Sequence, residues 1–112
     1  MIAKKFRFGK KADFDKVFNS QNKFYSNNFV LRYCKTKNLN NRFSIVVSKK
    51  ISKKAVVRNK IRRRIYEVLR LNLEKMNIPY DIILLVKRGV VDMEYPDIEK
   101  EILYILKKSK LL

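Results

Sequence analysis

Hydrophobic side chains in the first half of the chain follow a helical spacing and then a strand spacing. Phe14, Val17 and Phe18 fall at i, i+3 and i+4 within residues 11–20, which places them on one face of a helix. Short segments then alternate between apolar and polar side chains and are separated by turn-forming residues. They are residues 23–25, 29–35 and 42–48. This half therefore predicts one helix followed by three strands.

The second half predicts a long helix, a buried strand and a final helix. Ser52 is the expected N-cap of a helix that reaches about Met76. The apolar stripe of that helix consists of Val57, Ile61, Ile65, Val68 and Leu69. Residues 81–87 form a continuous apolar strand, as expected for a central strand covered on both faces, and Pro96 suits the first turn of the last helix. The whole pattern predicts an α+β fold in the order α-β-β-β-α-β-α, with helices packed on a small, mixed four-stranded sheet.

The chain is expected to form a single domain over residues 1–112, because it contains no repeat, linker or low-complexity segment. Residues 1–9 are predicted to form a basic, mobile N-terminal arm. The N-terminal segment lacks the apolar run of a signal peptide, and no stretch approaches the length of a membrane span. Cys34 is the only cysteine, so no internal disulfide can form, and a buried, inert thiol is expected. These features indicate a protein of the reducing cytoplasm.

Charge changes this picture most. The chain has 28 Lys and Arg against 10 Asp and Glu, which gives a net charge of +18. A polyanionic partner would relieve the repulsion among these charges and release counterions, so a nucleic acid is the expected partner. An anionic membrane is the weaker alternative. The absence of histidine excludes His-based catalysis and His-ligated metals, and two glycines are too few for a Gly-rich phosphate loop.

The basic side chains concentrate in residues 49–70, which carry ten Lys and Arg but a single acid, Glu67. Side chains at i, i+3, i+4, i+7 and i+11 form one helical stripe, which consists of Asn59, Arg62, Arg63, Tyr66 and Arg70. Lys60 and Arg64 flank this stripe. The alternative, a merely solvated face, would interleave acids with the bases for i,i+4 support. Guanidinium groups suit phosphates and RNA edges, so the segment predicts a helix face that binds RNA.

Two further pairs of residues are candidates for contact with single-stranded nucleic acid. Lys49 and Lys50 end the third strand directly before the basic helix, which concentrates positive potential there. Phe14 and Phe18 have two interpretations, as core residues that pack the first helix on the sheet or as platforms for base stacking. The acids, in contrast, show no cluster of the kind that holds divalent ions for phosphodiester cleavage. We therefore expect no catalytic residue and no metal site in the chain.

Residues 46–67, VVSKKISKKAVVRNKIRRRIYE, resemble the signature of the bacterial ribonuclease P protein subunit. That signature is a strand ending in Ser-Lys-Lys, followed by a helix that opens Ala-Val-x-Arg-Asn-x-Ile-basic-Arg. The matching residues are Ser48, Lys49, Lys50, Ala55, Val56, Arg58, Asn59, Ile61, Arg62 and Arg63. The segments DFDKVF and YDIILLVKRGV resemble the family's first helix and last strand, so the resemblance covers nearly the whole chain.

The resemblance implies a division of labour in tRNA maturation. Chemistry would belong to an RNA subunit and to magnesium ions bound mainly through it, while the protein assists removal of the 5′ leader from precursor tRNA. The RNA subunit would bind Arg58, Asn59, Lys60, Arg62, Arg63, Arg64, Tyr66 and Arg70. A cleft between the first helix and the sheet would hold the single-stranded leader, through Phe14, Phe18, Val30, Arg32, Val46, Ser48, Lys49 and Lys50. The family also implies a left-handed β-α-β crossover and no small-molecule substrate.

Three positions depart from the family pattern. Lys60 replaces the last arginine of an Arg-Asn-Arg trio, and Tyr66 stands where another arginine is usual. Arg32 replaces a frequent aromatic residue, so stacking there would become a cation contact.

Alternatives from other classes are a ribosomal-type structural RNA-binding protein, a self-sufficient nuclease and a membrane-active basic protein. The segment from Ser-Lys-Lys to Arg-Asn favours ribonuclease P over the first, and the lack of histidine and of clustered carboxylates argues against the second. Acids at the start of the last helix would oppose an anionic bilayer.

Overall fold

The computed structural model describes residues 2–112, which contain three α-helices and a four-stranded sheet. The helices are α1 (Lys11–Asn19), α2 (Ala55–Asn72) and α3 (Tyr95–Lys108). The strands are β1 (Lys23–Tyr25), β2 (Phe29–Lys35), β3 (Arg42–Val46) and β4 (Tyr80–Val86). Short 3-10 turns are η1 (Lys4–Phe6), η2 (Leu73–Lys75) and η3 (Arg88–Asp92). The predicted α+β fold in the order α-β-β-β-α-β-α is confirmed.

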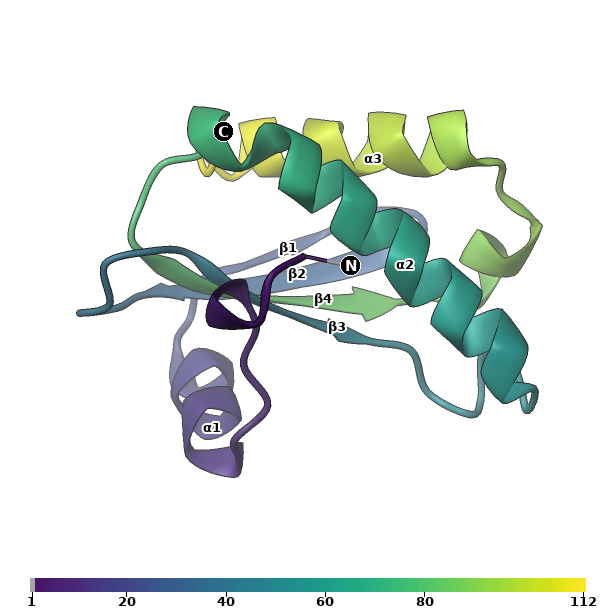
Figure 1. Ribbon diagram of the computed structural model, residues 1–112, viewed down its shortest axis with the longest axis horizontal. Helices are drawn as coiled ribbons and strands as arrows, with labels where there is room; N and C mark the ends of the chain where they lie inside the picture. The colour runs from purple at the N-terminus through teal and green to yellow at the C-terminus, as the bar shows by residue number, and fades with distance from the viewer. Residues whose placement is uncertain (1) are drawn as a thin grey trace.

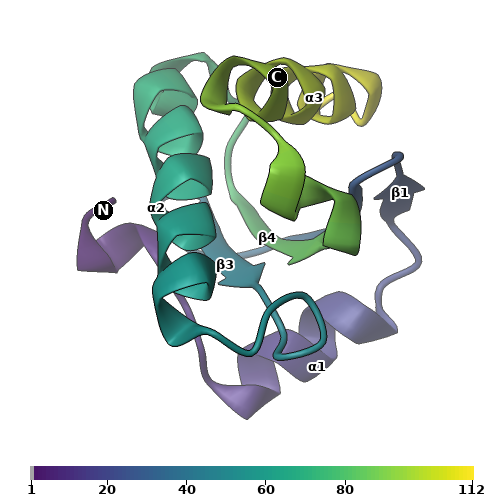
Figure 2. The ribbon, with the colours of Figure 1, turned by 90° about the vertical axis from the view of Figure 1, so that its right-hand side faces the viewer.

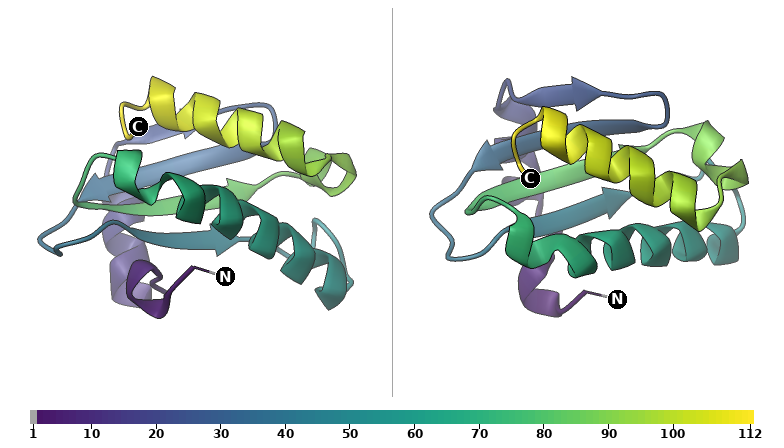
Figure 3. Two further views of the ribbon diagram at one scale, coloured as in Figure 1. Left: turned by 45° about the horizontal axis from the view of Figure 1, so that its top comes forward. Right: turned by 90° about the horizontal axis from the view of Figure 1, so that it is seen from above.

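The sheet has the strand order β1-β2-β4-β3 and mixes both kinds of pairing. β2 is antiparallel to β1 and to β4, whereas β3 and β4 are parallel. α2 connects these two parallel strands and lies on the same face of the sheet as α3 (Figure 3). When the sheet is seen from the helix side with both strands pointing up, β4 lies to the left of β3 (Figure 3). The connection from β3 through α2 to β4 is therefore a left-handed crossover. This is the sense that the family resemblance implies, and it is an exception to the usual right-handed rule.

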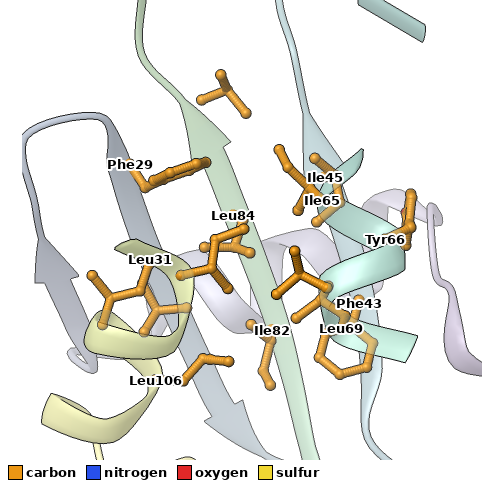
Figure 4. Close-up of a cluster of buried hydrophobic side chains, with 14 of the residues drawn as sticks. Phe29, Leu31, Phe43, Ile45, Ile65, Tyr66, Leu69, Ile82, Leu84 and Leu106 are labelled. Carbon is orange, nitrogen blue, oxygen red and sulfur yellow. The ribbon is translucent and has the colours of Figure 1, made fainter. Parts of the chain in front are cut away.

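The two faces of the sheet are covered unequally. α2 and α3 lie on one face, and α1 lies beneath one end of the other (Figure 1, Figure 2). The larger core fills the space between the sheet and the two long helices, where strand and helix side chains converge (Figure 4). Its fully buried members include Phe29, Leu31, Phe43, Ile65, Leu69, Ile82, Leu84, Ile102 and Leu106. A smaller cluster next to α1 consists of Phe8, Val17, Cys34 and Ile83. None of the described helices covers the other end of that face.

The N-terminal segment is part of this packing. Ile2 is 2% exposed and Phe8 is 8% exposed, and the Phe8 N–H donates to the Phe43 carbonyl at 3.1 Å. Arg7 forms a parallel bridge with Phe43, so this segment lies along the outer edge of β3. The prediction of a mobile arm is wrong for residues 2–8, because two of their apolar side chains occupy buried positions. Met1 lies outside the described residues.

The long helix begins later than predicted. Lys54 occupies the N-cap position, and the Ser52 hydroxyl accepts a hydrogen bond from the Lys54 N–H at 3.2 Å instead of capping the helix. β3 already ends at Val46, so residues 47–54 form an irregular connection that we call the β3–α2 loop. At its other end α2 reaches Asn72, and η2 extends close to the predicted end at Met76.

Candidate nucleic-acid interface

The first half of α2 presents guanidinium groups that the backbone of the β3–α2 loop holds in place. Arg58 Nη1 donates to the Ser52 carbonyl at 2.9 Å. Arg62 Nη1 donates to Asn59 Oδ1 at 2.7 Å, and Arg62 Nη2 approaches the Val47 carbonyl at 3.4 Å. Because a guanidinium has five donors, these contacts orient each group and leave further donors for an anion. The structure thus brings together Asn59 and Arg62, as the helical spacing predicts, with Arg58, which the family resemblance names.

The next cations of α2 point in two directions. Lys60 and Arg63 are exposed. Arg64 is half-buried, and its Nη1 donates to the Met93 carbonyl at 3.3 Å beyond η3. Arg64 is therefore directed away from the β3–α2 loop, toward the segment that precedes α3.

Arg70 at the end of the predicted stripe has an acidic partner. Its Nη2 lies 2.6 Å from Glu67 Oε1, and the hydrogen bond lowers the pKa of Glu67 and raises the pKa of Arg70. The positive charge available to a polyanion therefore concentrates in the first half of α2. We call this surface the arginine face, and it consists of Arg58, Asn59, Lys60, Arg62 and Arg63.

Tyr66 does not lie on the exposed stripe where the helical wheel places it. Its side chain is 6% exposed and belongs to the larger core, at whose edge Figure 4 shows it. Burial raises the pKa of the Tyr66 hydroxyl, and a hydrogen bond with the Ile45 backbone opposes that rise. The ring therefore packs toward β3, a strand that a wheel of α2 alone does not include. This burial contradicts the prediction that Tyr66 is an RNA-contacting residue.

A second surface lies on the face of the sheet that carries α1. Val30 on β2 pairs with Leu85 on β4, and Leu85 pairs with Val46 on β3, so these three side chains form a row across the strands. All three are half-buried, whereas Cys34 and Ile83 in the neighbouring rows are buried next to α1. We call Val30, Leu85 and Val46 the open row.

α1 forms a wall beside the open row. The Phe14 and Phe18 rings stack with their centres 6.4 Å apart and an interplanar angle of 17°, and Phe8 packs on Phe14 at 5.4 Å. Phe14 is half-buried against the smaller cluster, whereas Phe18 is 38% exposed. Arg32 extends from β2 over the Phe18 ring, with its guanidinium carbon 4.9 Å from the ring centre. Phe14 is therefore largely a core residue, and Phe18 has ring surface open to solvent.

A buried ion pair fixes α1 to the sheet. Arg42 Nε and Nη2 donate to the two carboxylate oxygens of Asp81 at 2.9 and 2.7 Å, across the β3–β4 pairing. Asp81 is 1% exposed, and Asp13 of α1 lies 3.3 Å from the same guanidinium. The hydrogen bond to Asp81 raises the pKa of Arg42, so this link between α1 and β4 stays charged. The position of the aromatic wall therefore depends on Arg42.

Lysines lie at the end of the open row. Ser48, Lys49 and Lys50 are exposed in the β3–α2 loop, directly after β3. Arg88 Nη2 donates to the Lys50 carbonyl at 3.3 Å and ties this loop to the segment after β4. We call the combined surface the α1-side surface, and it consists of Phe14, Phe18, Val30, Arg32, Val46, Ser48, Lys49, Lys50 and Leu85.

Comparison with known proteins decides the family. The model of the family described as Ribonuclease P matches residues 2–110 of the chain. The chain belongs to the ribonuclease P protein family. The ribonuclease P protein component of Fusobacterium nucleatum is 36% identical over 107 residues, which cover 92% of this chain and 96% of that protein. The protein of the same name from Clostridium botulinum strain 657 is 40% identical over 102 residues, 89% of this chain and 90% of that one.

Solved structures agree. The RNase P protein from Staphylococcus aureus matches with a TM-score of 0.85 at 31% identity, over 95% of this chain and 96% of that chain. Membership of the family makes the chain the protein component of a ribonucleoprotein endoribonuclease of tRNA processing. The family resemblance of residues 46–67 is thereby confirmed.

Sequence analysis did not identify three residues that lie on this side of the sheet. Leu85 was assigned to a strand covered on both faces, yet it is half-exposed in the open row. Lys87 follows Leu85 at i+2, and its Nζ donates to the Ser26 carbonyl at 2.8 Å. Tyr25 pairs with Val30 and is 56% exposed. The period of two could have placed Lys87 beside Leu85, but Tyr25 becomes visible only once the register of β1 on β2 is known.

The family resemblance implies magnesium ions that are bound mainly through the RNA subunit. Within residues 2–112, no three His, Cys, Asp or Glu side chains group so that they could hold a metal ion. In the same part of the chain, no helix combines the length and the apolar character that a membrane crossing requires.

Proposed function

We propose that this chain binds the RNA subunit of ribonuclease P through its arginine face and the 5′ leader of precursor tRNA through its α1-side surface. Bound in this way, it assists the endonucleolytic removal of the leader that makes the mature tRNA 5′ end. Family membership supports an RNA partner, and a net charge of +18 supports a partner rich in phosphates.

The observation that carries this proposal is that one loop joins the two surfaces. Lys49 and Lys50 of the β3–α2 loop lie at the end of the open row. Carbonyls of the same loop hold Arg58 and Arg62 in the arginine face. A folded RNA bound on the arginine face would therefore lie beside a strand held on the α1-side surface, as cleavage of that strand by the RNA requires.

The two surfaces suit two forms of RNA. Fixed guanidinium groups bind phosphates of a folded RNA, whatever its sequence. An apolar floor, an aromatic wall and cations at the end suit a single strand, whose bases can stack while its phosphates meet the lysines. A duplex buries its base faces by pairing and stacking and would gain little from such a surface. The leader, which is unpaired, is the part of precursor tRNA that fits.

Cleavage in this proposal belongs to the RNA subunit and to magnesium ions bound mainly by it. The protein contributes cations that share the neutralisation of phosphates, so the holoenzyme should need less magnesium than the RNA alone. The proposal places the chain in the cytoplasm, with neither a membrane nor a small molecule as its partner.

Reconstitution with a ribonuclease P RNA and a precursor tRNA tests the proposal. The protein alone should not cleave, whereas RNA and protein together should cleave at a lower magnesium concentration and bind precursor more tightly than mature tRNA. Equal binding of the two tRNAs with an unchanged magnesium requirement would instead indicate a ribosomal-type structural RNA-binding protein. Cleavage by RNA-free protein that survives repurification would also contradict the proposal.

A further inference from the structure

We infer that Tyr25 is a stacking platform for a leader base and extends the α1-side surface to the β1 edge of the sheet. The inference rests on the proposed function, because it adds a contact to the leader that the function requires. It would make Tyr25 a residue that senses the part of the leader farthest from the RNA subunit.

Strand pairing puts Tyr25 in line with the open row. Tyr25 pairs with Val30, which pairs with Leu85, which pairs with Val46, and directly paired residues share a face of the sheet. Neighbouring strands lie about 4.8 Å apart, so the row from Tyr25 to Val46 is about 14 Å long. Tyr25 is 56% exposed, whereas the other three members are half-buried. The row therefore ends in an open aromatic ring.

Two ammonium groups lie over this ring, at the outer limit of a cation–π contact. Lys23 Nζ lies 5.9 Å and Lys87 Nζ lies 6.0 Å from the centre of the Tyr25 ring. Lys87 is held there by its hydrogen bond of 2.8 Å to the Ser26 carbonyl. A base stacked on the ring would have cations close to its own phosphates. This is the combination of stacking and charge that proteins use to bind single strands.

Phe18, the other exposed ring on this side, has less surface to offer. It is 38% exposed against 56% for Tyr25. The Arg32 guanidinium lies over it at 4.9 Å, and Phe14 stacks with it at 6.4 Å. A base that approaches Phe18 meets the Arg32 guanidinium at 4.9 Å from the ring centre, whereas the Lys23 and Lys87 ammonium groups lie farther from the Tyr25 ring, at 5.9 and 6.0 Å, and leave more of it exposed.

The place of Tyr25 also predicts which leader nucleotides it meets. The arginine face and the β3–α2 loop adjoin β3, at the opposite edge of the sheet from β1. A leader that leaves the RNA subunit at the β3 edge reaches Tyr25 last. The row of about 14 Å corresponds to about four stacked nucleotides at about 3.4 Å each. Contact with Tyr25 therefore requires a leader longer than about four nucleotides.

The test measures the affinity of reconstituted holoenzyme for precursor tRNAs with a leader of about two or about eight nucleotides. Tyr25→Ala should weaken binding of the long-leader precursor about five-fold or more and leave the short-leader precursor unchanged. Tyr25→Phe keeps the ring and should bind both as the wild type does. Tyr104→Ala is the matched control, because Tyr104 is 51% exposed and lies on α3. Thermal melting of each variant verifies its fold.

Weakening by Tyr25→Ala that is equal for both leader lengths, or absent for both, would overturn the inference. So would an equal effect of Tyr104→Ala, since the base would then occupy the cavity of about 560 Å³ between the β1–β2 turn and α3, which both tyrosines line. Lys49→Ala distinguishes a failure of the Tyr25 inference from a failure of the proposed function. If it weakens both precursors while Tyr25→Ala weakens neither, the proposed function stands and the inference fails. If neither variant weakens either precursor, both fail.

Discussion

The arginine face and the α1-side surface are neighbours that would hold RNA by different physics. The arginine face carries cations, of which the β3–α2 loop holds Arg58 and Arg62 in place. Tyr66, the one aromatic residue of α2, is buried. The α1-side surface has an apolar row and aromatic rings, with lysines at its end. The first should give strong, salt-dependent affinity for any phosphate backbone, and the second a preference for unpaired bases. One small basic protein can thus separate affinity from selectivity by using two surfaces that share a loop.

Charge reversal on the arginine face should have the largest effect. If Arg58, Arg62 and Arg63 each reach a phosphate, replacing all three by Glu should flatten the slope of log affinity against log salt by about two to three. Affinity for the RNA subunit, measured by filter binding over a salt series, should fall at every salt concentration. Arg70→Ala is the control and should leave the slope nearly unchanged, because Glu67 already pairs with Arg70. An unchanged slope in the triple variant would mean that these arginines face solvent in the holoenzyme.

Loss of the buried ion pair should affect stability most. Arg42→Ala leaves Asp81, which is 1% exposed, without its cation. Removing one partner of a buried pair costs about 3–5 kcal/mol, so thermal melting should show a large destabilisation.

Asp13→Asn is the milder companion variant, because it keeps the Arg42–Asp81 pair and removes only the α1 carboxylate that lies 3.3 Å from Arg42. Cys34, the only thiol, is buried next to α1, and burial raises its pKa. The thiol should therefore react slowly with an alkylating reagent in the wild type and faster in Asp13→Asn. Equal labelling rates in the two proteins would show that Arg42 does not hold α1 through Asp13.

Phe18→Ala should have a smaller effect, which tests whether the α1-side surface selects the leader. Loss of a stacking partner should weaken holoenzyme binding of precursor tRNA by about 1 kcal/mol and leave mature tRNA unaffected. Phe14→Ala should lower the melting temperature more than Phe18→Ala, since Phe14 is half-buried against the smaller cluster. If well-folded Phe18→Ala loses affinity equally for both tRNAs, the ring does not select the leader.

Tyr66→Phe should have the smallest effect. It keeps the buried ring and removes only the hydroxyl, which costs about 1 kcal/mol or less in stability. RNA affinity and its salt slope should not change, because the side chain lies in the core. A clear loss of RNA-subunit affinity without a loss of stability would show that the Tyr66 hydroxyl contacts the RNA subunit.

The α2 surface could be predicted where local geometry decides it. The apolar stripe with Ile61 and Ile65, and the cation Arg62 outside it, follow from the helical period alone. The same argument failed at Tyr66, because its burial depends on β3, which lies outside the helix. It failed for residues 2–8 for a similar reason, since their buried positions are created by the edge of the sheet.

The α1-side surface was only partly predictable. Val30 and Val46 entered through the family resemblance, and the structure places them in one row. Leu85 and Tyr25 were missed, because the row that a strand residue joins depends on pairing register between segments far apart in the chain. Sequence patterns give the period of each strand but not its partner, so the middle and the β1 end of this surface required the structure.

Site-specific photocrosslinking in the reconstituted holoenzyme tests the central claim most directly. A photoreactive phenylalanine analogue replaces Phe18 on the α1-side surface, Lys60 on the arginine face or Leu39 in the β2–β3 loop, which is 88% exposed and belongs to neither surface. The account predicts that position 18 crosslinks to the precursor leader, position 60 to the RNA subunit and position 39 to neither. Leader crosslinks from position 60 but not from position 18 would contradict the account.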